Sequence, residues 1–397
     1  MRRATGPLVA ALAAALLAGG PATAAAQAPP PSTSGAAALV VDARTGERMH
    51  AVNAGRARPI ASATKLMTAL LTLERAELDA VFPAADYAAS PVESKIGLMP
   101  RERMRVRDLL TALLLESAND AAVTLAQGVA GSRDAFVREM NRRAVSLGLR
   151  DTSYANPIGF DEPDNHSSAR DLAVLTRRLL ENRQFARIVD LPRATLMSGA
   201  RTRTIDNRNR LVARHPFVSG VKTGHTQGAG YVLVGSGAAG GGRVITVTLG
   251  APSEAARDAD TLALLRWGLD QFQQVRVLRR GEELARLDVE HRDEDAAVGP
   301  GRPVTLVVRR DQRLRRVVDA PDELEGPLDR GERVGWVEVR RDGRMVRRVP
   351  LVTLSEVEGA GFLRGLAGAL GTLLIVGILL GIVLTAVWAV RRRRGTP

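Results

Sequence analysis

Residues 60–69 read Ile60-Ala61-Ser62-Ala63-Thr64-Lys65-Leu66-Met67-Thr68-Ala69, and this short stretch decides the fold. Apolar residues follow at the spacing i, i+3, i+4 and i+7, which predicts a helix over residues 62–76. Residues three apart lie side by side on a helix, so the Lys65 amine can reach the Ser62 hydroxyl. A serine hydroxyl is a weak nucleophile that needs an adjacent base. A lysine is such a base once burial or a nearby cation lowers its pKa.

Lysine is scarce in this chain, which makes the motif more informative. Of 56 basic residues among 397, only Lys65, Lys95 and Lys222 are lysine, and the rest are arginine. Where a positive charge alone suffices, the chain therefore uses arginine. Each lysine is a candidate for a position that needs a compact, titratable amine.

The overall composition excludes several classes of function. The chain has no cysteine, so disulfide scaffolds, thiol nucleophiles and cysteine-ligated metal centres are excluded. Its formal net charge is +13, but with three tryptophans and three tyrosines it has few aromatic side chains to stack on nucleic-acid bases. The basic excess is therefore not a sign of nucleic-acid binding, and we expect no nucleic-acid partner. We also expect no metal and no cofactor.

Two further motifs carry polar side chains suited to a site. Ser117-Ala118-Asn119 follows an apolar stretch and is expected in a turn between helices, where Ser117 can relay a proton and Asn119 can bind a substrate amide. Lys222-Thr223-Gly224 precedes an apolar strand and is expected on an edge strand. There Lys222 can bind a substrate carboxylate and lower the pKa of a neighbouring lysine. Gly224 lets a ligand backbone come close.

The two ends of the chain predict export and membrane attachment. Residues 1–26 have the basic start, apolar run and small-residue end of a secretory signal peptide, with cleavage after Ala24 or Ala26. Residues 27–35 are expected to be a linker. Residues 365–390 contain no charge and are long enough to cross a bilayer. Four arginines open the tail at 391–397, which the positive-inside rule places in the cytoplasm. An N-terminal anchor and a buried C-terminal core helix are the alternatives.

Between these ends the pattern predicts two domains. Strands are expected at residues 38–42, 47–52, 230–235 and 244–249, with helices over 105–182 and 259–272. This order favours an α/β (α+β) domain over residues 36–273, whose first and last strands close around a helical lobe. Residues 274–355 alternate apolar and charged residues, and Asp342-Gly343 is typical of a hairpin turn. They predict a small β-rich C-terminal domain.

The ordered set of S-x-x-K, S-x-N and K-T-G is far more specific than its members, and it is the set found in penicillin-binding proteins and class A β-lactamases. The chain resembles the low-molecular-weight penicillin-binding D-alanyl-D-alanine carboxypeptidases, serine peptidase family S11. The matching stretches are residues 60–69, Glu116-Ser117-Ala118-Asn119-Asp120-Ala121-Ala122, Val221-Lys222-Thr223-Gly224-His225-Thr226, Ala229-Gly230-Tyr231, Asn156-Pro157-Ile158-Gly159-Phe160-Asp161 and His166-Ser167-Ser168-Ala169-Arg170-Asp171. The resemblance implies a β-lactamase/transpeptidase-like domain with an antiparallel sheet and a helical lobe, followed by a β-rich domain.

The resemblance also implies catalytic roles. Ser62 is the acylated nucleophile and Lys65 its general base, while Ser117 and Asn119 assist proton transfer and position the substrate. The backbone N–H groups of Ser62 and His225 form the oxyanion hole.

The substrate-binding roles implied by the resemblance concern the K-T-G strand. Lys222 and Thr223, with Gly224 beside them, engage the terminal carboxylate, and Arg257 is similar to a family arginine near that site. The implied substrate is a peptidoglycan stem peptide ending in D-Ala-D-Ala, which loses its last D-Ala, and penicillins acylate the same serine. Ser219 and Ile158 depart from the usual acidic residue and histidine, which puts substrate preference in doubt.

Three alternatives remain open at this point. A class A β-lactamase shares the three motifs but needs a deacylating glutamate before K-T-G, and Glu162 beside Pro163 lacks the expected context. A D,D-endopeptidase of the same family cleaves cross-links with the same residues. A non-catalytic wall-binding scaffold is expected to show a broken set of motifs.

Overall fold

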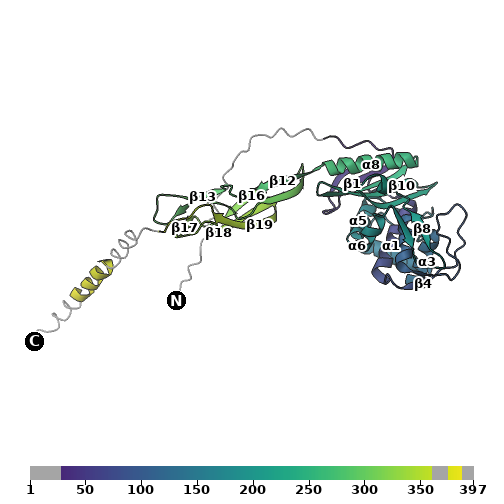
Figure 1. Cartoon of the computed structure of the whole chain (residues 1–397), viewed down its shortest axis with the longest axis horizontal. Helices are drawn as coiled ribbons and strands as arrows, with labels where there is room; N and C mark the ends of the chain where they lie inside the picture. The colour runs from purple at the N-terminus through teal and green to yellow at the C-terminus, as the bar shows by residue number, and fades with distance from the viewer. Residues whose placement is uncertain (1–27, 360–373, 387–397) are drawn as a thin grey trace, which may run out of the picture. The chain divides into compact units, whose positions relative to one another are not determined.

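The computed structural model describes residues 28–359 and 374–386. They divide into two compact units, shown in Figure 1, and each is described here by itself. One unit comprises residues 28–273 with 307–310, and the other comprises 274–306 and the described residues from 311 onward. The predicted signal peptide lies outside the described residues.

The first unit contains eight α-helices, one short 3-10 helix and eleven strands among the described residues. In chain order they are β1 (Ala37–Asp42), β2 (Arg48–Val52), β3 (Arg58–Pro59), η1 (Ala61–Thr64), α1 (Lys65–Arg75), β4 (Val81–Pro83), β5 (Arg103–Arg105), α2 (Val106–Leu115), α3 (Asn119–Ala130), α4 (Arg133–Ser146), β6 (His166–Ser167), α5 (Ala169–Leu180), α6 (Arg183–Val189), β7 (Arg193–Leu196), β8 (Arg203–Asp206), α7 (Leu211–Arg214), β9 (Val218–Thr226), β10 (Gly230–Ala239), β11 (Gly242–Ala251) and α8 (Glu254–Asp270).

A five-stranded antiparallel sheet in the order β2-β1-β11-β10-β9 forms the centre of this unit. The pairing of β1 with β11 runs from Ala37 opposite Leu249 to Asp42 opposite Val244. All the helices from α1 to α7 lie between these strands in the sequence. The prediction that the first and last strands close around an inserted helical lobe is therefore confirmed.

Both faces of the sheet are covered, and the alternation of residues along β1 shows why. Ala37, Leu39 and Val41 pack into the core of the helical lobe, while Ala38 and Val40 pack under α8. Successive side chains of a strand point to opposite faces, so a central strand between two layers is apolar throughout. Figure 1 shows α8 on one side of the sheet and α5 on the other.

Local capping signals set several helix boundaries. The Ser132 hydroxyl accepts the Ala135 N–H and the Ser168 hydroxyl accepts the Asp171 N–H, so serine caps the N-termini of α4 and α5. The last helix begins at Glu254 rather than 259, because Ser253 caps it.

The prediction of helix throughout residues 105–182 is wrong for the segment between α4 and α5. That segment is irregular except for the two residues of β6. Gly148 has a left-handed φ of 72°, and Pro157 and Pro163 lack the N–H that a helix needs. The segment therefore crosses to the sheet as a loop, and its β6 residues pair with β3 beside the start of α1.

The second unit is built from strands. They are β12 (Phe272–Leu278, which begins at the unit boundary), β13 (Ala285–Val289), β14 (Ala296–Pro300), β15 (Val304–Arg309), β16 (Leu314–Asp319), β17 (Glu323–Leu324), β18 (Arg333–Arg341) and β19 (Arg344–Thr353). Six of them form a sheet in the order β16-β18-β19-β14-β13-β17. Asp342 and Gly343 both have positive φ between β18 and β19, which confirms the predicted hairpin turn.

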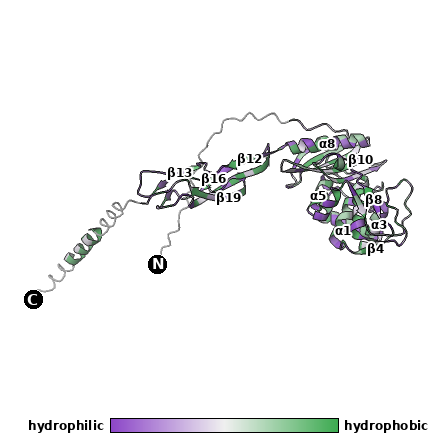
Figure 2. Cartoon of the chain, viewed as in Figure 1, coloured by the Kyte–Doolittle hydropathy of each residue, from purple (hydrophilic) through white to green (hydrophobic). Residues whose placement is uncertain are grey.

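Residues 374–386, within the predicted membrane span, form a helix. Its hydrophobic residues are green in Figure 2. The remainder of the span and the tail at 391–397 lie outside the described residues. Within 28–359 and 374–386, the structure has no helix with the length and hydropathy needed to cross a membrane.

Candidate active site

Ser62 and Lys65 lie at the junction of η1 and α1, where the chain changes from a 3-10 turn to an α-helix. The Lys65 Nζ donates to Ser62 Oγ at 3.0 Å and to the Ile158 carbonyl at 2.5 Å. Side chains three apart eclipse in a 3-10 turn, which aligns the amine over the hydroxyl. Ala61, just before the serine, has a φ of 47°, and strain of this kind is typical of functional sites.

The Lys65 amine is buried completely, and its surroundings favour the neutral form. Burial lowers the pKa of Lys65 well below its ordinary value, and the charge of Lys222 lowers it further. The carboxylate of Glu93 opposes both effects. A neutral amine in contact with the Ser62 hydroxyl can accept its proton.

The Ser117–Asn119 motif forms the turn between α2 and α3, as the sequence predicts. Ser117 has a φ of 64°, and its buried Oγ has no hydrogen-bond partner among the described residues. Asn119 is the first residue of α3 and is buried, and its Nδ2 donates to Glu93 Oε2 at 2.8 Å. An unpaired buried hydroxyl is costly, so Ser117 is available to a ligand.

Lys222, Thr223 and Gly224 lie on β9, the edge strand of the sheet, as predicted. A Cβ at Gly224 would meet the backbone nitrogen of Ser62 at 2.9 Å and the Cβ of Ala61 at 3.0 Å. The close approach at Gly224 is thus made by the chain's own backbone. The absence of a side chain there brings β9 against the residue that carries the nucleophile.

Two arginine cations act on the buried Lys222 amine. The pKa of Lys222 is lowered to about 7, chiefly by burial and then by the charges of Arg208 and Arg257, while the charge of Glu116 raises it. Arg257 is itself buried and is held by Glu254 and Asp258. Such a cluster favours an anion that neutralises it.

His225 follows Gly224 on β9 and is exposed, with its ring stacked on Tyr231 at 4.1 Å between centroids. Asp161 accepts hydrogen bonds from the Thr226 hydroxyl and the Gly228 N–H, which ties the 156–166 loop to the end of β9. A cavity of about 500 Å³ lies beside this tie, but Ser62 and the three lysines do not line it.

The structure sets Gly224 of the third motif against the Ser62 backbone, and the charge of Lys222 acts on Lys65. Asn119 of the second motif bonds to Glu93, whose charge also acts on Lys65. Sequence reasoning missed Glu93 and Arg208. Neither stands in a pattern that marks it, because Glu93 lies in an irregular loop and Arg208 is one arginine among many. In the part of the chain that the structure describes, no group of three or more histidine and carboxylate side chains is placed to hold a metal ion.

Comparison with known proteins decides the family. The model of the D-alanyl-D-alanine carboxypeptidase family matches residues 23–253, and that of the penicillin-binding protein 5 C-terminal domain matches residues 272–359. The chain belongs to the D-alanyl-D-alanine carboxypeptidase family. Membership makes it a serine carboxypeptidase of the penicillin-binding class, with an α/β catalytic domain and a β-rich C-terminal domain.

Individual relatives agree with this assignment. The chain is 33% identical over 344 residues to the D-alanyl-D-alanine carboxypeptidase DacD of Escherichia coli. This match covers 82% of this chain and 88% of that protein. The chain is 28% identical over 343 residues to DacF of Bacillus subtilis, covering 84% and 88%. The crystal structure of penicillin binding protein 6B from Escherichia coli superposes with a TM-score of 0.61 at 30% identity, covering 83% of this chain and 98% of that one.

Proposed function

We propose that the chain removes the terminal D-Ala from peptidoglycan stem peptides through an acyl-enzyme on Ser62. The contact between Lys65 Nζ and Ser62 Oγ carries this proposal. Neutral Lys65 takes the hydroxyl proton as the oxygen attacks the carbonyl carbon of the D-Ala-D-Ala bond. The leaving D-Ala amine receives a proton through Ser117, and water then hydrolyses the ester.

The oxyanion and the substrate are held by groups on both sides of Ser62. The N–H groups of Ser62 and His225 stabilise the tetrahedral oxyanion, because preorganised donors act where charge develops. Gly224 supports this assignment, since its close approach sets β9 beside the Ser62 nitrogen. Asn119 positions the substrate amide.

The terminal carboxylate is bound by Lys222 and Thr223, with Arg257 and Arg208 adding positive charge. Penicillins carry a carboxylate and a reactive amide, so they acylate the same serine. Burial is the main cause of the lowered pKa of Lys222, and the positive charges of Arg208 and Arg257 lower it further. This concentration of positive charge supports an anion site.

The decisive experiment labels the protein with a fluorescent penicillin and measures D-Ala release from a pentapeptide ending in D-Ala-D-Ala. Ser62→Ala is expected to abolish both, while Ser146→Ala, an exposed serine of α4, leaves both intact. Rapid turnover of penicillin indicates a β-lactamase instead. Preferential cleavage of cross-linked dimers indicates an endopeptidase, and absent labelling of the wild type indicates a scaffold.

We further propose that residues 1–26 direct export and that residues 365–390 anchor the chain in the inner membrane, with the tail at 391–397 in the cytoplasm. The uncharged length of the segment and the four arginines after it support this orientation. Removal of 365–397 is expected to release active protein from membranes, whereas removal of 391–397 alone is not. Retention of the longer deletion in the membrane fraction contradicts the anchor.

A further inference from the structure

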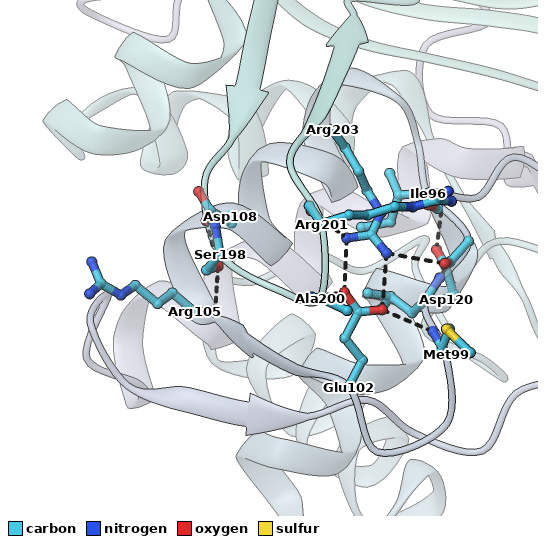
Figure 3. A network of polar contacts seen from close by, with 12 residues as sticks. Ile96, Met99, Glu102, Arg105, Asp108, Asp120, Ser198, Ala200, Arg201 and Arg203 are labelled. Atoms are coloured by element: carbon cyan, nitrogen blue, oxygen red, sulfur yellow. Dashed lines mark hydrogen bonds and ion pairs between the residues drawn. The ribbon is translucent and has the colours of Figure 1, made fainter.

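The loop between β4 and β5, residues 84–102, is tied to the β7–β8 hairpin by a buried ion pair. The two Nη atoms of Arg203 donate to the two carboxylate oxygens of Glu102 at 2.8 and 2.9 Å (Figure 3). Their side chains are 7% and 2% exposed. A bidentate arginine–carboxylate pair fixes geometry as well as charge. The end of the loop is therefore held firmly.

The same loop is also tied to the start of α3. Asp120 accepts the N–H of Ile96 at 3.2 Å and that of Leu98 at 2.9 Å, the former also visible in Figure 3. The Asn119 N–H donates to the Ser94 carbonyl at 2.8 Å. Three residues of the loop thus bond to the two residues that follow Ala118. The loop takes its position from the motif that carries Asn119.

These ties place Glu93 against the site. Its Oε2 accepts the Asn119 Nδ2 at 2.8 Å and the Tyr87 hydroxyl at 2.5 Å, and its Oε1 accepts the Ser90 N–H at 2.8 Å. The Lys95 amine donates to the Ser90 carbonyl at 2.8 Å, which closes the turn behind the carboxylate. Lys95, the remaining lysine of the chain, therefore supports Glu93.

A carboxylate partner removes an ambiguity from the Asn119 side chain. An amide has a donor end and an acceptor end, and an ionised carboxylate can only accept. Bonding to Glu93 therefore fixes the donor end toward the loop. Nδ2 carries two hydrogens, and one of them is donated to Glu93.

The charge of Glu93 also acts on the base. Burial raises the pKa of the Glu93 carboxyl, but the hydrogen bonds from Tyr87, Asn119 and Ser90 and the charge of Lys95 outweigh this and lower it, so Glu93 is ionised at neutral pH. The charged groups acting on Lys65 are Lys222 from β9 and Glu93 from the loop, with opposite effects on its pKa.

We propose that Glu93 is a positioning residue for the acylation of Ser62, which orients the Asn119 amide and balances the charge of Lys222 at Lys65. The proposal rests on the proposed function for the reaction that it serves. Among the described residues, Glu93 makes no hydrogen bond to Ser62 or Lys65. It acts through its hydrogen bond to Asn119 and through the electrostatic effect of its charge on Lys65.

The first test follows the lysines directly, because the chain has only three. The full-length protein in detergent, labelled with ¹³C at the lysine Cε, is titrated by NMR, and Lys65→Arg assigns the Lys65 signal. Glu93→Gln keeps the shape and removes the charge, so the Lys65 midpoint is expected to move to lower pH. Glu139→Gln, which alters an ion-paired glutamate of α4, is the matched control and leaves the midpoint unchanged.

The second test measures D-Ala release and penicillin acylation against pH. Glu93→Gln is expected to move the acid limb of the profile to lower pH, in step with the Lys65 midpoint. Glu93→Ala also removes the acceptor of Asn119, and kcat/KM is expected to fall about tenfold, chiefly in kcat. Glu93→Asp is expected to recover part of that loss. Circular dichroism establishes that each variant is folded.

An unchanged Lys65 midpoint in Glu93→Gln together with an unchanged rate in Glu93→Ala overturns the proposal. A loss of rate with an unshifted profile in both variants also overturns it, since a merely structural role gives that result. Failure of the wild type to be labelled by penicillin contradicts the proposed function instead. The lysine titration then still shows whether Glu93 acts on Lys65.

Discussion

The Nζ of Lys65 lies 3.0 Å from the Oγ of Ser62, and the 3-10 turn that begins at Ala61 produces this contact. In an α-helix, residues three apart are offset around the axis, whereas in a 3-10 turn they eclipse. Gly159 contributes to the geometry, because a Cβ there would meet the Ala61 carbonyl oxygen at 2.0 Å. The nucleophile is thus held by backbone packing, and the base is held by its contact with the Ile158 carbonyl.

Lys65→Arg is expected to be nearly inactive although it keeps a basic side chain of similar length. A guanidinium does not lose its proton in proteins and cannot act as a base. General-base catalysis typically contributes about 10²–10⁴-fold, so the rate of acylation by penicillin should fall by that factor. Lys222→Arg is expected to be milder, because a guanidinium still binds a carboxylate. Near wild-type acylation in Lys65→Arg with an inactive Lys222→Arg reverses the two roles.

The pH dependence follows from the two buried lysines. Lys65 must be neutral to accept the serine proton, so acylation falls as the pH drops through its lowered pKa. Lys222 must be charged to bind the carboxylate, so substrate capture weakens as the pH rises through about 7. The profile of kcat/KM is therefore bell-shaped. In Lys222→Arg the alkaline limb is expected to disappear, and a limb that stays in place contradicts its assignment to Lys222.

The sequence predicted those parts of the molecule that depend on local pattern. The strand at residues 38–42 and the Asp342-Gly343 turn each depend on neighbouring residues, and the structure confirms both. The pairing of the first and last strands followed from the order of the elements.

The parts that the sequence did not predict depend on tertiary contacts. Glu93 is 26 residues from Asn119, and only the folding of an irregular loop brings them together. Arg208 matters because its charge lowers the pKa of the buried Lys222, and no local pattern shows that Lys222 is buried. The extended prediction of helix failed between α4 and α5 because apolar periodicity on either side was continued across glycine and proline residues.

Gly224→Ala is expected to disrupt the site rather than the fold. The added Cβ would lie 2.9 Å from the Ser62 nitrogen. This nitrogen belongs to the backbone, so it cannot move aside as the end of a flexible side chain can. Overpacking of this kind costs about 1–3 kcal/mol, and here it shifts the nucleophile. Gly55→Ala is the control, since its Cβ meets the flexible end of Arg170. Equal acylation rates for the two variants contradict the assigned contact.

The ion pair between Arg203 and Glu102 provides a prediction about stability. Because both side chains are buried, Arg203→Met leaves the Glu102 carboxylate without its cation and is expected to lower the free energy of unfolding by about 3–5 kcal/mol. Replacing both residues by methionine removes the buried charge and is expected to cost less than the single change. The exposed pair Arg193–Asp206 is the control, and its loss should cost at most about 1 kcal/mol. Chemical denaturation of the wild type and these three variants measures the differences, and an equal cost for the buried and exposed pairs contradicts the role of burial.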